Sequence, residues 1–440
     1  MELQAELAQT LKRIPNSSHS LCELIEPAWI EGALQASGKA SIRKRKLPAE
    51  HVVWLVIGLA LFRHQPIWHV VRQLDLTLEQ ATTSSPSLGV PSASVQGRQR
   101  LGAEPMEQLF RQLTRAWTMP APEHTPRLNG LRVLAVDGVV WSAPDTPPNR
   151  LGLGSCANQH GQGSWPQIRA VCLMDTYSHE LLDAQLGGMP QGELTLAAEL
   201  QAPDHTLTIF DRAYFSATFL LDWQAQGQQR HWLMRAKDNL RHEVVHTHGP
   251  GDYSIRMPTS PRARKLHPGL APWWQARLIE VELGGQTRRF VTSLNDPVCY
   301  PAQALAQLYR QRWEIELGFR EIKQSLQANA FVLRSKQPAL VRQEIWGVLI
   351  AYTLLRRQMR LMAEHLQVPP VRMGFHVASI AIIDVLRFAP LQTPVTLPKR
   401  LALLFEQAHL FLLPPRRARS CPRVVKLRSS KYPRKMPVSS

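Results

Sequence analysis

The chain has 440 residues, enough for about two to four domains, and its 44% hydrophobic content excludes a disordered basic tail. Lys and Arg number 52 against 34 Asp and Glu, a formal net charge of +18, and so basic a folded chain usually binds a polyanion, nucleic acid before anionic membrane. The longest apolar runs, Val52–Phe62 and Ile345–Leu355, reach about half of the roughly twenty residues that a membrane span needs. Five scattered cysteines without a CxxC pair argue against a disulfide framework or structural zinc and favour a reducing compartment.

Residues 1–125 are predicted to form a helical N-terminal domain that binds DNA. Pro48 follows a basic cluster and stands where proline often opens a helix, and an apolar run comes after it. Further along, Ser92 or Ser94 is placed to cap a short helix that Gly102 would end.

This short helix carries Arg98 and Arg100, which we expect to be exposed. Two basic side chains in such a position favour a helix-turn-helix-like reader of DNA. The alternative is the charged face of an ordinary helical bundle, and the sequence does not separate the two.

Residues 126–400 are predicted to form the second domain, an α/β domain. Three short β-rich runs close together indicate an antiparallel meander, and two more alternate with helical stretches, so we expect a mixed sheet. The pattern loosens over about 239–287 and predicts a β-rich insertion. Two helices are expected after it, at Ala302–Leu326 and Leu340–Glu364. Residues 401–440 form a basic C-terminal tail able to contact phosphate.

Two acidic residues stand directly after buried β-runs. Asp137 ends the run LRVLAVD, and Asp211 ends the run LTIFD. A carboxylate in this position is held by the sheet while its head faces a cleft, which is how sheet ends supply ligands to hard cations. The alternative is structural, because strand ends collect Asp residues that bond nearby backbone N–H groups.

A later helical segment, YRQRWEIELGFREIK, concentrates polar side chains on one face. Tyr309, Arg312, Glu316 and Lys323 are spaced by three, four and seven residues, so at 100° per residue they fall within about 80° of one another. The alternative is an ordinary solvent-exposed helix face whose Arg–Glu ion pair stabilises the helix by a few tenths of a kcal/mol.

Large apolar side chains surround this polar helix face and favour partial burial of Glu316. They belong to Trp313, Leu317 and Phe319. A partly buried Glu between two cations is a suitable third metal ligand, and the cations can hold a phosphate beside it.

The spacing of these four residues is similar to the signature of bacterial DDE transposases of the insertion-sequence-four family. The VDG and FDRAYFS segments around Asp137 and Asp211 resemble the family's other two acidic motifs, and TSLND resembles the strand before the signature. RKRKLPAEHVVWLVIGLALFR resembles the family's N-terminal domain and VVKLRSSKYPRK its basic end, so the resemblance covers nearly the whole chain.

The resemblance implies a fold, a metal centre and a reaction. The fold would be a ribonuclease-H-like catalytic domain with a β-rich insertion before the third acid. Asp137, Asp211 and Glu316 would be the catalytic triad that binds two Mg²⁺ ions, with Mn²⁺ as a substitute, while Tyr309, Arg312 and Lys323 would contact transposon-end DNA. The enzyme would cut terminal inverted repeats and join the 3′-OH to target DNA, as a homodimer, in the bacterial cytoplasm.

Other interpretations stay open. The string His242-Glu243-xx-His246 matches the HExxH motif of zinc proteases, but Val244 and Val245 favour a strand over the helix that such a site needs. Asp145 is a rival to Asp137 as the first acid, and we prefer Asp137 because a strand fixes it. A DNA-binding relative without catalysis is the remaining alternative.

Overall fold

The computed structural model describes residues 25–40, 47–74, 92–158, 161–163, 165–330, 332–388 and 402–414. The start of the predicted tail at residue 401 is wrong, because residues 402–414 contribute Leu404, Ala408 and Phe411 to the buried core. The remainder of the tail and the basic cluster of residues 42–46 lie outside the described residues. The N-terminal region is helical, as predicted, with α3 (Pro27–Ala36), α4 (Ala49–Leu61), α5 (Ile67–Gln73), α6 (Ser92–Leu101) and α7 (Glu104–Trp117).

A mixed sheet forms the centre of the molecule. Its first part is β2 (Leu131–Ser142), β5 (Gln167–Asp175), β6 (Leu181–Gly188), β7 (Thr206–Phe210) and β8 (Arg230–Arg235). β2, β5 and β6 form the predicted antiparallel meander, whereas β7 pairs in parallel with both β2 and β8. The short β1 (Arg127–Leu128) pairs with β2.

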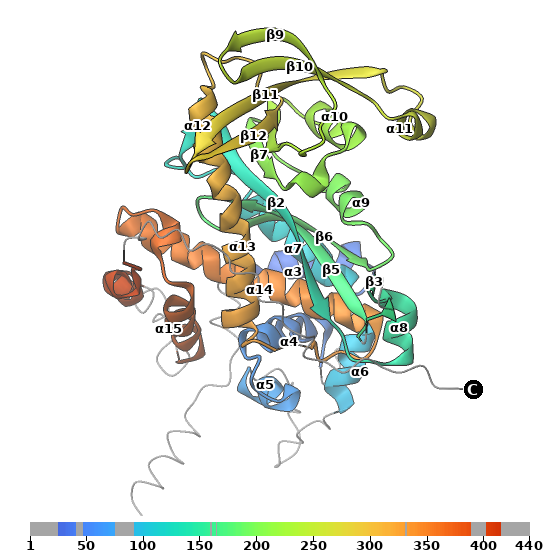
Figure 1. Cartoon of the computed structure of the whole chain (residues 1–440). Helices are drawn as coiled ribbons and strands as arrows, with labels where there is room; N and C mark the ends of the chain where they lie inside the picture. The colour runs from blue at the N-terminus through green and yellow to red at the C-terminus, as the bar shows by residue number, and fades with distance from the viewer. Residues whose placement is uncertain are drawn as a thin grey trace, which may run out of the picture.

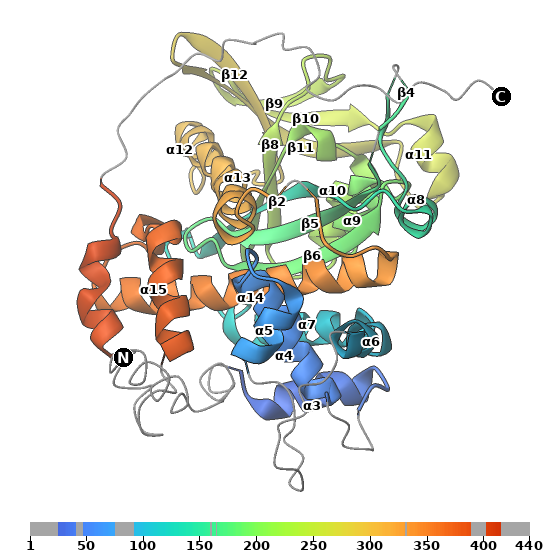
Figure 2. The ribbon, with the colours of Figure 1, turned by 90° about the horizontal axis from the view of Figure 1, so that it is seen from below.

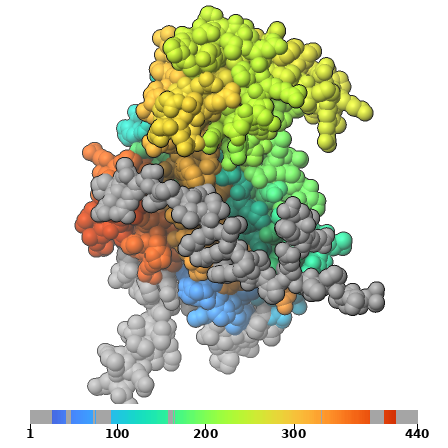
Figure 3. Space-filling view, in the orientation of Figure 1, coloured from blue at the N-terminus to red at the C-terminus, as the bar shows by residue number. Residues whose placement is uncertain are grey.

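The segment expected to be a β-rich insertion continues this sheet. Its elements are β9 (Glu243–Gly249), β10 (Asp252–Pro258), α11 (Pro261–Leu266) and β11 (Trp273–Leu283), followed by β12 (Gln286–Thr292). All four strands are antiparallel to their neighbours, and β12 returns to pair with β8, so the order across the sheet is β6-β5-β2-β7-β8-β12-β11-β10-β9. In Figure 3 these strands form a lobe, yellow-green to yellow, at the top of the molecule.

Helices cover both faces of the sheet. On one face lie α9 (Glu193–Ala198) and α10 (Ala217–Ala225), whose side chains share a core with Leu134 and Val136 of β2. On the other face α13 (Trp313–Arg320) lies across β2, and its Ile315 and Phe319 share a core with Ala135 (Figure 1). Consecutive residues of β2 therefore point to α9 on one side and to α13 on the other.

The chain that leads into and out of α13 is not one α-helix. It runs as α12 (Ala302–Leu308), a 3₁₀ turn (Tyr309–Arg312), α13 and a π-helical segment (Glu321–Leu326). The predicted continuous helix over Ala302–Leu326 is therefore broken into four consecutive parts with different numbers of residues per turn.

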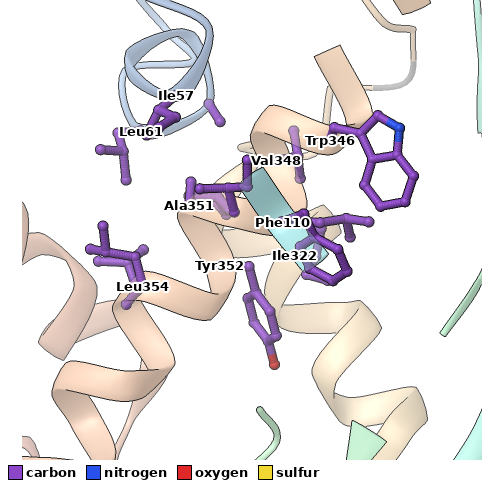
Figure 4. Close-up of a cluster of buried hydrophobic side chains, with 14 of the residues drawn as sticks. Ile57, Leu61, Phe110, Ile322, Trp346, Val348, Ala351, Tyr352 and Leu354 are labelled. Atoms are coloured by element: carbon purple, nitrogen blue, oxygen red, sulfur yellow. The ribbon is translucent and has the colours of Figure 1, made fainter. Parts of the chain in front are cut away.

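The long helix α14 (Pro338–His365) joins the sheet to the N-terminal helices. Figure 2 shows it between the sheet and α4, α5 and α7, and α15 (Phe375–Phe388) packs beside its C-terminal half. Side chains from α4, α7, α14 and the π-helical segment meet in one core in Figure 4: Ile57, Leu61, Phe110, Ile322, Trp346 and Tyr352. Among the described residues no helix is long and apolar enough to cross a bilayer.

The crossing of α14 and α4 predicts a strong effect of a single methyl group. A Cβ atom at Gly347 would lie 2.7 Å from Val56 Cγ1 and 2.9 Å from the Val56 carbonyl oxygen. Because backbone of α4 cannot yield cheaply, we expect Gly347→Ala to lower the free energy of unfolding by about 1–3 kcal/mol. Urea denaturation followed by circular dichroism measures this change.

The control is Gly32→Ala in α3, where the nearest atom to the new Cβ would be Gln112 Oε1 at 3.9 Å. This change should be neutral or stabilising by up to about 1 kcal/mol, since Ala favours a helix over Gly. Equal effects of the two substitutions would contradict the predicted close contact.

Candidate active site

The site forms where β7 ends and β2 continues, paired only with β5. The parallel pairing of the two strands covers Arg132–Val136 of β2 and stops at Phe210 of β7. Asp137 is the next residue of β2, and Asp211 is the first residue after β7. Since the carboxyl ends of parallel strands lie at the same edge, the two aspartates become neighbours.

Each aspartate uses one carboxylate oxygen to fix its own position. Asp137 Oδ1 accepts a hydrogen bond of 2.8 Å from the Gly138 N–H, and Asp211 Oδ1 accepts one of 3.3 Å from the Ala213 N–H at the start of a 3₁₀ turn (Arg212–Tyr214). The second oxygen of each side chain remains directed toward Arg312.

Arg312 is the centre of the cluster. Its Nη1 lies 3.9 Å from Asp137 Oδ2 and 4.0 Å from Asp211 Oδ2, and its Nη2 lies 2.8 Å from Glu316 Oε1. The side chain is only 12% exposed, and its guanidinium also lies 5.0 Å from the centre of the Trp313 ring. One cation therefore gathers carboxylates from β2, from the turn after β7 and from α13.

The surroundings of Asp137 disfavour the charged form of its carboxylate. Burial raises the pKa of Asp137 to about 6. The Gly138 N–H and Arg312 oppose this rise, whereas the nearby Glu193 and Glu316 carboxylates add to it. A further cation at this place would relieve the repulsion among the acidic side chains.

The donor set suits a hard divalent cation. Carboxylate oxygens are the ligands that Mg²⁺ and Mn²⁺ prefer, and the two Oδ2 atoms, both within 4.0 Å of one nitrogen, are at most about 8 Å apart, which two ions about 4 Å apart can bridge. In the described part of the chain no three His, Cys, Asp or Glu side chains already stand together as ligands. Here the Arg312 guanidinium lies among the carboxylates instead.

The other two residues of the predicted stripe have separate surroundings. The Tyr309 hydroxyl donates to the Phe210 carbonyl at 3.4 Å and its ring packs on Phe290, so it lies beside Asp211. Lys323 is farther along, where its Nζ donates to the Val140 carbonyl at 2.8 Å and burial lowers its pKa. Tyr309, Arg312 and Lys323 all contact β2 or the end of β7. The segment faces the sheet with these side chains, but it does so through 3₁₀, α and π geometry and not as the continuous α-helix that was predicted.

The predicted apolar surround of Glu316 is correct in part. Phe319 is buried, but Trp313 is 47% exposed at the surface beside Arg312. Burial of the site comes instead from β2 beneath it and from the Arg312 side chain across it.

The prediction that Arg98 is exposed on a DNA-reading helix is wrong. It is only 4% exposed, and its guanidinium donates to Gln343 Oε1 at 2.8 Å and to Ser335 Oγ at 2.9 Å. It ties α6 to α14 and is not available to a phosphate, whereas Arg100 is exposed as expected. The partners of Arg98 lie more than 230 residues away in sequence, so no local pattern could identify them.

Two further expectations concern the rival motifs. Asp145 forms an ion pair with Arg150 of α8 (Pro147–Leu153), apart from Arg312, so Asp137 is the acid that joins the cluster. Glu243 and His246 lie on the strand β9 and Glu243 pairs with Arg256 at 2.6 Å, so the zinc-protease interpretation is wrong: its motif requires a helix.

Behind the site a buried network holds the helix that carries Glu316. Arg356 of α14 donates to Glu321 through Nε at 2.9 Å and through Nη2, and the Tyr352 hydroxyl donates to the same carboxylate at 2.9 Å. His179, in the turn between β5 and β6, lies 2.8 Å from Glu314 and 3.3 Å from Glu321. The network joins α13, the π-helical segment, α14 and the sheet.

The pKa values of this network move in opposite directions. Burial alone would raise the pKa of Glu321, but Arg356 and His179 outweigh it and hold that pKa at about 2. Burial alone would lower the pKa of His179, but the Glu321 and Glu314 carboxylates outweigh it, against Arg356, and raise that pKa above its ordinary value.

Comparison with known proteins places the chain in one class, the DDE transposases. Residues 128–354 match the family model described as "Transposase DDE domain", and residues 15–111 match "Insertion element 4 transposase N-terminal". The chain belongs to the DDE transposases of the insertion-sequence-four family.

Two relatives in Escherichia coli (strain K12) are similar over long stretches. The "Transposase InsG for insertion sequence element IS4" is 38% identical over 431 residues, which cover 97% of this chain and 96% of that protein. The "Putative transposase InsZ" is 34% identical over 250 residues, or 55% of this chain and 81% of that protein. A solved piggyBac transposase synaptic complex with hairpin DNA covers 91% of this chain and 84% of its own at 7% identity, with a TM-score of 0.41 that is too low to bear on the fold.

The network behind the site predicts a pH-dependent loss of stability. At pH 7 we expect Glu321→Gln to lower the free energy of unfolding by about 3–5 kcal/mol, because it leaves Arg356 buried without its partner. Since the folded pKa of Glu321 is depressed, its contribution is complete above about pH 4.5 and is lost as the pH falls toward 2. In the variant His179 also loses the Glu321 carboxylate that raises its pKa, so the contribution of Glu321 itself is measured below about pH 4.5, where His179 is protonated in the unfolded chain throughout.

Urea denaturation of both proteins at steps between pH 7 and pH 3 measures the difference. It should shrink on acidification, and a difference independent of pH would contradict the assignment. Glu364→Gln is the control, because the Glu364 side chain is exposed and its pair with Arg360 should contribute below about 1 kcal/mol.

Proposed function

We propose that this chain is an active insertion-sequence transposase. It would bind the terminal inverted repeats, hydrolyse a phosphodiester bond at each end and join the freed 3′-OH to target DNA. The observation that carries the proposal is the convergence of Asp137, Asp211 and Glu316 on the Arg312 guanidinium, from three separate elements.

The topology supports a ribonuclease-H-like catalytic domain. An antiparallel β6-β5-β2 meander continues into the parallel strands β7 and β8, with α9 and α10 on one face and α13 on the other. The strands β9–β11 would then be an insertion between the last parallel strand and the helix of the third acid. Domain boundaries at about residues 125 and 400 are part of this proposal.

The cofactor would be Mg²⁺, or Mn²⁺ in its place, as two ions held by Asp137, Asp211 and Glu316. When bound, the ions would supply a stronger water nucleophile and neutralise the leaving 3′-oxygen. The protein's own contribution is to hold the two aspartates by their backbone hydrogen bonds, so that one oxygen of each stays free for the cation.

Arg312 is placed to hold the scissile phosphate once a cation takes over the carboxylates. Its planar fork of N–H groups matches two phosphate oxygens, which a Lys cannot do. Tyr309 would contact the same DNA strand beside Asp211, Lys323 would contact it farther along β2, and Arg100 would bind phosphate from the N-terminal helices. The +18 charge would attract the rest of the duplex, and two copies would synapse the two ends in the cytoplasm.

The metal-binding role of Glu316 predicts loss of cleavage with retention of DNA binding. We expect Glu316→Ala, and likewise Asp137→Ala and Asp211→Ala, to lower Mg²⁺-dependent cleavage of the cognate end by at least about a thousandfold, or some 4 kcal/mol of transition-state stabilisation. Gel-shift affinity for the end should change little, because phosphate contacts dominate it.

Glu364→Ala, an exposed acid on α14, should leave cleavage unchanged. Cleavage by Glu316→Ala at the wild-type rate would overturn the assignment. Binding without cleavage by the wild-type protein itself would instead indicate an inactive DNA-binding relative.

Arg312→Lys separates a phosphate-holding role from a purely structural one. The charge is kept but the fork is lost, so we expect single-turnover cleavage of a nicked end to fall by about ten- to a hundredfold, because a misplacement of about 1 Å costs this much. The cleavage rate is measured at saturating protein. The affinity of the protein for DNA should hardly change. An unchanged rate would reduce Arg312 to the structural partner of Glu316.

A further inference from the structure

A fourth carboxylate, Glu193, approaches the site from the opposite face of the sheet. It is the first residue of α9, whose Leu196 and Ala197 pack with Val136 of β2, whereas α13 and Glu316 lie across the other face. The sequence places Glu193 in a Gly- and Pro-rich stretch 56 residues after Asp137, where no spacing connects it to the acidic motifs.

Two side chains hold the Glu193 carboxylate in place. Tyr214, three residues after Asp211 and only 2% exposed, donates from its hydroxyl to Glu193 Oε1 at 2.6 Å. Arg169 of β5 lies on the other side, with its Nε 3.7 Å from Glu193 Oε2.

The glycine after Asp137 provides the space for this approach. A Cβ atom at Gly138 would lie 2.7 Å from Glu193 Oε1 and 3.0 Å from Oε2, closer than such contacts occur. The Glu193 carboxylate therefore rests directly against the backbone unit whose N–H fixes Asp137. Any side chain at position 138 would push it away.

Glu193 also acts electrostatically on the first acid. The Gly138 backbone unit has a carboxylate against each side, because Asp137 Oδ1 accepts from its N–H and the Glu193 carboxylate lies where a Cβ atom of Gly138 would be. Two carboxylates that repel each other at a half-open edge, one held by Tyr214 and one by Gly138, are stabilised together by a cation between them.

We propose that Glu193 is a fourth acidic ligand of the metal centre, sharing a divalent cation with Asp137 from the α9 side of the sheet. This inference rests on the proposed function, since it adds a residue to the centre formed by Asp137, Asp211 and Glu316. Four carboxylates then surround the edge that β7 leaves open, two from the sheet and one from each face.

The test uses Mn²⁺ alone and needs no DNA. Titration of the full-length protein with Mn²⁺, with free ion measured by electron paramagnetic resonance, gives the dissociation constant. Glu193→Gln keeps the size of the side chain and its acceptor for Tyr214 but removes the charge, so we expect the dissociation constant to rise by about tenfold or more. A thermal melt without metal should remain close to wild type and verifies folding.

The matched control is Glu199→Gln, at the far end of the same helix and exposed, which should bind Mn²⁺ as the wild type does. A wild-type dissociation constant for Glu193→Gln would overturn the inference. Asp211→Asn separates failure of the proposed metal centre from failure of the role of Glu193. If Asp211→Asn and Glu193→Gln both bind Mn²⁺ normally, the proposed metal centre fails. If Asp211→Asn loses Mn²⁺ binding and Glu193→Gln does not, only the role of Glu193 fails.

Gly138 gives a second, independent measurement. Gly138→Ala should weaken Mn²⁺ binding by displacing Glu193, yet the same change should have no further effect once Glu193 is replaced by Ala. Additive effects of the two substitutions would contradict the proposed contact.

Discussion

Acidic side chains from separate parts of a chain repel one another, so a folded protein can gather them only around a positive charge. Arg312 supplies that charge here: its two terminal nitrogens face Asp137, Asp211 and Glu316 at 2.8–4.0 Å. The guanidinium suits this role because it is always ionised and offers donors in several directions. The placement of β2, β7 and α13 serves to bring their acids to this one side chain.

The position of α13 depends in turn on polar groups buried behind it. Arg356, Tyr352 and His179 fix Glu321, and His179 also fixes Glu314, on either side of Glu316 along the segment. Such a network is costly to bury and has few alternative arrangements, so it specifies one register of the helix against the sheet. The change to π geometry after Arg320 then directs Lys323 to the Val140 carbonyl, away from the carboxylates.

Sequence reasoning succeeded where the signal was local. The antiparallel meander, Asp211 directly after β7 and the Arg312–Glu316 pair follow from apolar periodicity and spacing. The expectation that Asp137 ends its strand is wrong, because β2 continues to Ser142. It failed where contacts are distant or geometry is unusual: Arg98 is buried by Gln343 and Ser335, which lie far along the chain. The π-helical turn that carries Lys323 has no clear sequence pattern. Glu193 left no signal, since only the folded sheet brings its helix to the back of Asp137.

The Arg312 guanidinium stabilises the metal-free site, and it also limits what can bind there. A divalent ion and Arg312 compete for the same carboxylate oxygens, and each oxygen released by Arg312 leaves an N–H donor without a partner. A phosphate beside the ion would supply that partner, so metal and DNA should favour each other's binding through this one side chain. An acid on the far face, outside the reach of Arg312, would let the first cation bind before the guanidinium moves, and Glu193 occupies that position beside Gly138.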